Sequence, residues 1–151
     1  MDRGDVPQKI RFHTQDKFPL KLMVWIAISP RGISEPYLCP RNMAMNGDIY
    51  RQNCIQDHLL PFLEEYHEDR NYFFFPDLAS CHYAKATTNL MEAENIPYIS
   101  KLTNPPNCPQ LRPTEDFWGA LKHKVYEDGF EVANFNQLKR RICLRLKEFD
   151  L

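Results

Sequence analysis

One stretch, Asn71–Ala84, constrains the fold of this chain more than any other, and it reads NYFFFPDLASCHYA. A short apolar run that ends at a proline is typical of a buried strand, so we expect one over Tyr72–Pro76. The residues that follow predict a helix over Ser80–Glu94 and a short strand over Ile96–Ser100. Strand, helix and strand in succession favour a parallel pair with a right-handed crossover, which indicates an α/β fold.

An antiparallel hairpin is expected before this stretch. Leu22–Ser29 is rich in β-branched and aromatic residues, and a tight turn, Pro30–Gly32, separates it from a second short strand over Ile33–Cys39. Pro36 lies inside the second strand and has no N–H to donate, so that strand is predicted to lie at the edge of a sheet.

The first long helix is expected between the hairpin and the aromatic stretch. Asp48 is a plausible N-cap for a helix that runs from Ile49 to about Tyr66, with its apolar residues largely on one face. Pro61 predicts a kink or a break near His58–Leu60, because proline removes one helical hydrogen bond.

Two further helices are expected in the C-terminal part of the chain, over residues 113–127 and 135–149. The first can begin at Pro113, and the second has Asn134 as its N-cap. Their core faces are predicted from apolar residues spaced four apart: Phe117, Leu121 and Val125 in one helix, and Leu138, Ile142 and Leu146 in the other.

The composition bounds the class of protein. At 151 residues the chain has the length of one domain, and its formal charge of −1 is not that of a protein that binds nucleic acid through bulk charge. No stretch is apolar enough to predict a membrane span, and the polar N-terminus is unlike a signal peptide. The five cysteines lack CxxC spacing and indicate reduced thiols in a cytosolic or nuclear protein: Cys39, Cys54, Cys81, Cys108 and Cys143.

Two acidic residues are candidates for chemistry. Asp77 directly follows a predicted strand, where open α/β sheets place their sites, and Glu115 opens a predicted helix. Two carboxylates that lie close together repel unless a cation is supplied, and a hard divalent metal such as Mg²⁺ supplies one. With a third carboxylate, two metal ions can promote phosphoryl transfer. The alternative from spacing alone is a turn residue and a helix-start residue stabilised by the helix dipole.

Other polar residues are further candidates for a functional site. His82 is a neighbour of a metal site, a nucleic-acid contact or an ordinary helix-start residue. Cys54 and His58, four apart, together with His67 suggest a zinc site that lacks a fourth ligand. Four basic residues are candidates for phosphate contacts or simply form a solvated face: Lys122, Lys124, Arg140 and Arg141.

The two acidic stretches resemble the motifs of one family. Asp77-Leu-Ala-Ser-Cys-His82-Tyr-Ala84 looks like the second-carboxylate motif of mariner-type transposases, and Cys108-Pro-Gln-Leu-Arg-Pro-Thr-Glu115-Asp-Phe-Trp118 looks like their third motif. Met23–Ser29 and the turn after it resemble the second strand and turn of the same domain. The resemblance extends from about residue 20 to 147.

The resemblance implies a ribonuclease-H-like mixed sheet with helices on its faces. It also implies a DDE-type carboxylate triad that holds Mg²⁺ or Mn²⁺ and a reaction of nicking and strand transfer at transposon ends. Asp77 then corresponds to the second carboxylate and Glu115 to the third. DNA as a partner, a homodimer and a nuclear location follow as expectations of the same resemblance.

The chain also departs from the family pattern. The first carboxylate is expected on a central strand well before Met23, and the acids available there, Asp2, Asp5 and Asp16, follow no apolar run. Residues 1–19 are therefore interpreted as an extended lead-in, and residues 20–151 as a truncated domain whose first strand is missing. Leu78, Gln110 and Arg112 also differ from the family motifs.

These departures lead to three expectations for function. The first is a transposase-derived endonuclease and strand-transfer domain that is inactive because one carboxylate of the triad is absent. The second is a non-catalytic module that binds nucleic acid or protein through its basic C-terminal helix. The third is a relic without function. A domain without its central strand is also expected to be less stable, because backbone groups at the sheet edges are left unpaired.

Overall fold

The computed structural model describes residues 20–105 and 113–149. The hairpin consists of four short strands, β1 (Val24–Trp25), β2 (Ile28–Ser29), β3 (Gly32–Ile33) and β4 (Tyr37–Leu38). β1 pairs antiparallel with β4, and β2 with β3. The predicted antiparallel hairpin is therefore confirmed.

The hairpin is interrupted in its middle by a side chain. Ser34 N donates to Ala27 O at 2.9 Å, but Ala27 N donates to the side-chain oxygen of Ser34, also at 2.9 Å. A hydroxyl thus takes the place of one backbone acceptor, and the ladder divides into two pairs of two-residue strands. The register also differs by one residue between the Ile28–Ile33 pair and the Val24–Leu38 pair, so the two long strands expected over Leu22–Ser29 and Ile33–Cys39 are each divided into shorter ones.

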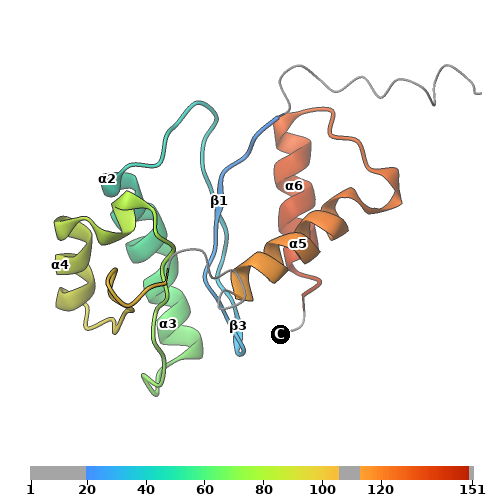
Figure 1. The fold of residues 1–151 in the computed structure, drawn as a ribbon. Helices are drawn as coiled ribbons and strands as arrows, with labels where there is room; N and C mark the ends of the chain where they lie inside the picture. Colours follow the sequence, from blue (N-terminus) through green and yellow to red (C-terminus); the bar gives the residue numbers. More distant parts are fainter. Residues whose placement is uncertain (1–19, 106–112, 150–151) are drawn as a thin grey trace, which may run out of the picture.

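The hairpin separates two hydrophobic cores, one on each face (Figure 1). Neighbouring residues of a strand point to opposite faces. Ile26 belongs to the core formed with the C-terminal helices, and Ala27 belongs to the core formed with the helices of the first half. One short hairpin therefore joins both halves of the molecule.

The helical path of the first half begins at α2 (Gly47–Ile49), continues through a π-helix, η1 (Tyr50–Leu59), and ends in α3 (Leu60–Tyr66). Its N-cap is Asn46, whose side chain accepts from Ile49 N at 2.9 Å, so the prediction of Asp48 as the cap was wrong. Asn46 has the extended backbone that a cap requires, and Asp48 lies inside the first turn.

Pro61 marks the expected irregularity in this path. The wide turns of η1 end at Leu59, and regular α-helix begins at Leu60, with proline in its first turn. Pro61 has no N–H to donate, and it follows directly after the wide i→i+5 bond from Leu60 N to Ile55 O. The helix therefore continues as a π-helix up to Leu59 and as an α-helix from Leu60, where a kink or a break was predicted.

The C-terminal half agrees closely with the sequence pattern. α5 (Pro113–Tyr126) is followed by a short 3-10 turn, η4 (Glu127–Gly129), and by α6 (Phe135–Leu146). Asn134 caps α6 through its side chain, which accepts from Gln137 N at 2.9 Å. Both predicted apolar rows are buried in the second core.

The aromatic stretch differs from the predicted buried strand. Only Phe74 forms a bridge, a parallel one with Tyr98, so the parallel pairing is confirmed but the strand is reduced to a single residue. Phe73 is 73% exposed and Phe75 is 39% exposed, whereas Tyr72 and Phe74 pack against the first core. Burial alternates along residues 72–75 because, among the described residues, other side chains cover only one face of this segment.

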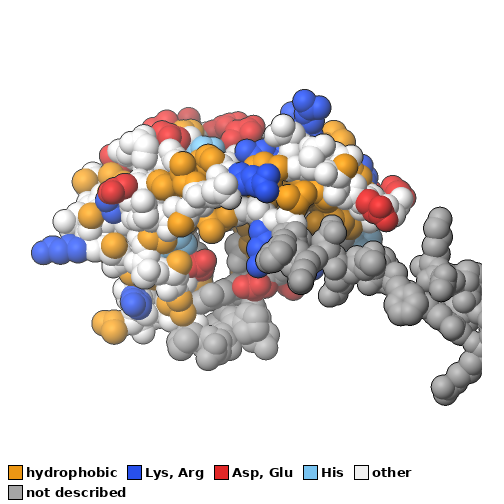
Figure 2. All heavy atoms as spheres, turned by 90° about the horizontal axis from the view of Figure 1, so that it is seen from above, with side chains coloured by type: hydrophobic (Ala, Val, Ile, Leu, Met, Phe, Trp, Pro, Cys, Tyr) orange, Lys and Arg blue, Asp and Glu red, His pale blue; other side chains and the backbone are white. Residues whose placement is uncertain are grey.

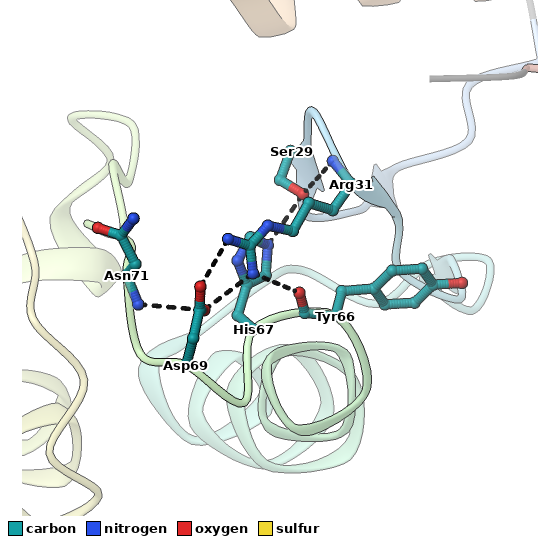
Figure 3. Close-up of polar contacts among 6 residues, drawn as sticks. All are labelled: Ser29, Arg31, Tyr66, His67, Asp69 and Asn71. Carbon is teal, nitrogen blue, oxygen red and sulfur yellow. Dashed lines mark hydrogen bonds and ion pairs between the residues drawn. The ribbon is translucent and has the colours of Figure 1, made fainter.

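The tip of the hairpin is tied to the end of α3 by charge (Figure 3). The guanidinium of Arg31 contacts both carboxylate oxygens of Asp69, at 2.8 and 2.7 Å, and donates to Tyr66 O at 3.1 Å. His67 Nε2 lies 2.9 Å from the hydroxyl of Ser29. Hydrogen bonding to Arg31 lowers the pKa of Asp69 to about 2, and burial lowers the pKa of His67.

Several broader expectations can be compared with the described residues. The cysteines among them are free thiols, as predicted: Cys39, Cys54, Cys81 and Cys143. Cys108 and the lead-in over residues 1–19 lie outside the described residues. None of the helices described is long and apolar enough to cross a membrane.

The alternating burial in the aromatic stretch predicts that truncation of two neighbouring phenylalanines changes the free energy of unfolding by very different amounts. Phe74→Ala removes a ring packed in the first core and should lower the free energy of unfolding by about 2 kcal/mol. The matched control, Phe73→Ala, should change it by no more than about 0.5 kcal/mol. Urea unfolding of both variants measures this, and equal losses would contradict the alternation.

The contact between Arg31 and Asp69 predicts a pH-dependent contribution to stability. Because the pKa of Asp69 is lowered in the folded state, its stabilising effect is fully present above the ordinary carboxyl pKa of about 4 and is lost as the pH falls through about 2. Asp69→Asn should therefore be less stable than the parent at pH 6 but not at pH 2. Glu68→Gln, an exposed neighbour, is the control, and a pH-independent difference would argue against the ion pair.

Candidate functional site

Asp77 directly follows the extended aromatic segment, as the sequence predicts. Its Oδ1 accepts from Ala79 N at 2.6 Å, which closes a tight turn around the carboxylate. The side chain is nevertheless 63% exposed. The turn therefore restrains the carboxylate in one orientation while leaving it accessible from solvent.

His82 packs beneath this turn. Its Nδ1 lies 3.0 Å from Asp77 Oδ1 and 3.2 Å from the main-chain oxygen of Asp77. The main-chain oxygen and the ionised carboxylate can each only accept a hydrogen bond. Nδ1 must therefore hold a proton in these contacts. The imidazole is 8% exposed and stacks on the buried ring of Tyr50, with centroids 4.1 Å apart.

The helix expected over Ser80–Glu94 is divided near this histidine. Ser80–Tyr83 forms a 3-10 turn, η2, and α4 begins only at Lys85 and ends at Ala93. Ala84 between them is extended, with φ −61° and ψ 142°. The break turns the chain so that the residues after Asp77 wrap around it, and a continuous helix would not allow that path.

Asn104 supports the site from a distant part of the sequence. It is almost fully buried, and its side-chain amide donates to Pro76 O and to the hydroxyl of Tyr83, each at 2.8 Å. That hydroxyl donates in turn to Ile99 O at 3.1 Å. Sequence analysis missed Asn104, because an asparagine before two prolines is also an ordinary loop signal.

Glu115 lies in the first turn of α5 and is exposed. Its helix is oriented by Phe117, Leu121 and Val125, which are buried in the second core. No hydrogen bond or ion pair between Glu115 and Asp77 is present among the described residues. Asp77 thus lies after an extended segment and Glu115 in a first helical turn, and no such contact joins the two acids among the described residues.

The chemistry of these two acids suits a hard cation, but the described residues do not bring three ligands together. Carboxylate oxygens are the ligands that Mg²⁺ prefers, and it needs only one or two from the protein. Within residues 20–105 and 113–149, no group of three or more His, Cys, Asp or Glu side chains could hold a metal ion. The zinc site considered at Cys54, His58 and His67 is therefore not formed, and burial raises the pKa of Cys54 to about 12.

The four basic candidates fall into two groups. Lys124 pairs with Glu148 at 3.8 Å, and Arg141 donates to Val125 O at 3.2 Å, so both are engaged within the C-terminal half. Lys122 and Arg140 are exposed. On the face shown in Figure 2, a few basic side chains lie near one another in the middle of the view, and the others are scattered among apolar and acidic ones.

An open groove of about 730 Å³ lies between the chain leading into β1 and helices α5 and α6. Its lining is mostly apolar, and Lys21 and Lys122 are the charged residues in it. The groove was not predicted from the sequence, because Leu22 and Trp118, which line it, have the pattern of ordinary core residues.

Comparison with known proteins gives similarity in structure only. No family model matches the sequence, and no curated protein matches it. The catalytic domain of Mos1 mariner transposase is similar with a TM-score of 0.58 and 20% identity, over 84% of this chain and 69% of that one. A structure of the same domain and Raltegravir with Mg has a TM-score of 0.59 and 19% identity, over 84% of this chain and 70% of that one.

A longer relative gives a closer overall similarity. The Mos1 transposase in a paired-end complex with the left transposon end has a TM-score of 0.68 at 19% identity, over 98% of this chain. This chain spans 46% of the length of that relative. The described elements and these similarities agree with the resemblance in the two acidic motifs. The chain therefore has the fold of a mariner-type transposase catalytic domain.

Proposed function

We propose that this chain is a mariner-type DDE domain derived from a transposase, with Asp77 and Glu115 as its second and third carboxylates. The main support is the placement of Asp77, an accessible carboxylate held by a turn at the end of a parallel extended segment. Such a position is the usual location of a site in an open α/β sheet. Glu115, in the first turn of a helix with its core face buried, provides a second accessible carboxylate.

The proposed cofactor is Mg²⁺ or Mn²⁺, which Asp77 and Glu115 would hold together with a further ligand. The solved structures of the Mos1 catalytic domain include one with Mn and one with Mg. When bound, such an ion would neutralise charge on a phosphodiester and on the attacking oxygen. The chain's own residues would orient the carboxylates, and His82 already contacts one of them.

The 151-residue chain is proposed to be inactive by itself. Only two of the three carboxylates implied by the resemblance match motif positions in this sequence. The ribonuclease-H-like arrangement is proposed with a further strand along the open edge of the aromatic segment, where no backbone hydrogen bond joins Phe73 or Phe75 to another described residue. The uncovered edge supports the expectation of reduced stability.

DNA is the proposed partner, with the nucleus as the place of action and a homodimer as the functional form. Mos1 transposase is found in complexes that contain transposon-end DNA or form a transpososome. In this chain, Lys122 and Arg140 are the exposed members of the basic set. A second candidate function follows from the same two residues: a non-catalytic module that binds nucleic acid without using the carboxylates.

Metal binding tests the proposed carboxylate pair. Asp77→Asn and Glu115→Gln should each weaken Mn²⁺ binding at least tenfold, measured by electron paramagnetic resonance of free Mn²⁺, because each removes one anionic ligand. Asp116→Asn alters the neighbouring exposed acid of the same helical turn and should leave the affinity unchanged. Equal effects in all three variants would indicate general charge attraction and not a site.

Cleavage and binding of DNA separate the two candidate functions. The unmodified chain with Mn²⁺ should not nick supercoiled plasmid, and nicking that depends on Asp77 would contradict the proposed inactivity. For the binding module, Lys122→Ala and Arg140→Ala should each reduce the slope of log affinity against log salt by about 0.9. Lys101→Ala, which lies outside the two C-terminal helices, is the control, and binding that persists after loss of both carboxylates favours the module.

A further inference from the structure

The imidazole of His82 lies between an accessible carboxylate and a fully buried ring. One edge of the ring faces Asp77, and one face stacks on Tyr50 with the two planes 25° apart. Tyr50 is wholly buried in the first core, where it also meets Trp25 edge to face. The position of the imidazole is therefore determined by the packed interior of the protein.

We propose that His82 is a positioning residue for Asp77, an inference that rests on the proposed function of that carboxylate. Nδ1 donates to the main-chain oxygen of Asp77 at 3.2 Å and lies 3.0 Å from the carboxylate Oδ1. One donor thus links the side-chain torsion of Asp77 to its backbone. Ala79 N donates to the same Oδ1 at 2.6 Å, so the backbone of the turn and the imidazole both contact this oxygen and contribute to the direction of the carboxylate.

The supports of this contact also come from the interior. Thr87, which is fully buried, donates through its hydroxyl to Cys81 O at 2.8 Å, directly before His82. Asn104 holds the carbonyl of Pro76, directly before Asp77. The residues directly before Asp77 and directly before His82 are thereby attached to buried side chains. The contact between His82 and Asp77 joins these two points. A residue placed in this way acts on the orientation of Asp77 and is not itself a surface contact for DNA.

Two substitutions distinguish the role of the Nδ1 donor from the bulk of the ring. In His82→Asn the side-chain amide nitrogen occupies roughly the place of Nδ1, whereas in His82→Gln it occupies roughly the place of Nε2. Both variants are amides of similar polarity, so a merely structural role predicts similar behaviour. Positioning predicts that the asparagine variant retains the parent behaviour and the glutamine variant loses it. Tyr50→Phe, which preserves the stacked ring, serves as a control.

Nuclear magnetic resonance of the 151-residue chain gives the decisive measurement without any metal. The χ1 couplings of Asp77 should report the same dominant rotamer in the parent, in His82→Asn and in Tyr50→Phe, and a lower population of that rotamer in His82→Gln, in which Ala79 N can still donate to Oδ1. Imidazole ¹⁵N shifts of the parent should show the proton on Nδ1. An unchanged rotamer population in His82→Gln, or a parent ring with Nδ1 unprotonated, would overturn the proposal. The parent tautomer gives a result even if the glutamine variant does not fold.

Mn²⁺ affinity then separates this proposal from the proposed function. His82→Gln should weaken Mn²⁺ binding by about tenfold or more, the usual effect of removing a group that orients a metal ligand, while His82→Asn stays near the parent. If the parent binds no Mn²⁺ while the rotamers follow the pattern above, the positioning role is supported and the metal-dependent function fails. Equal Mn²⁺ affinity in the parent and in His82→Gln would contradict positioning toward a metal.

Discussion

The opposite directions of Ile26 and Ala27 are the constraint on which the rest of the structure depends. One side chain enters the core of the C-terminal helices, and the other enters the core that contains Tyr50 and Met91. Because a strand alternates strictly, a shift of one residue in the register would exchange both contacts at once. The bond between Ala27 N and the Ser34 hydroxyl lies at this point, between two pairings whose registers differ by one residue.

The candidate site depends on the first of these cores. Tyr50 supports His82, His82 contacts Asp77, and Asn104 and Thr87 secure the chain on either side. Glu115 depends on the second core through the buried face of α5. The two proposed carboxylates are therefore held by different halves of the molecule, and the hairpin between the cores is the element common to both (Figure 1).

Where the determinants are local, the sequence was sufficient to predict the structure. Asn134 and the apolar rows of α5 and α6 specify those helices within a few residues, and the turn at Pro30–Gly32 specifies the hairpin. The errors arise where the outcome depends on distant contacts. Asn46 and Asp48 are both good caps, and the backbone conformation decides between them. The burial of Phe73 and Phe75 depends on what covers them, which composition does not determine.

The site shows the same division. Asp77 and Glu115 could be selected from motif and position, but the surroundings of His82 could not. Tyr50 lies more than thirty residues before the histidine, and Asn104 contacts partners 28 and 21 positions away. These contacts depend on tertiary folding, so a single sequence gives no direct signal for them. The contact between Asp77 and His82, within five positions, is the part that a local pattern suggested.

The open edge of the aromatic segment has a consequence for the behaviour of the protein in solution. Phe73 and Phe75 present apolar rings beside backbone groups that no other described residue pairs with. Such an edge is a template for any extended chain of suitable length, including another copy of the same segment. Pairing with this edge would satisfy those backbone groups, so whichever extended segment covers it also excludes a second copy from the same place.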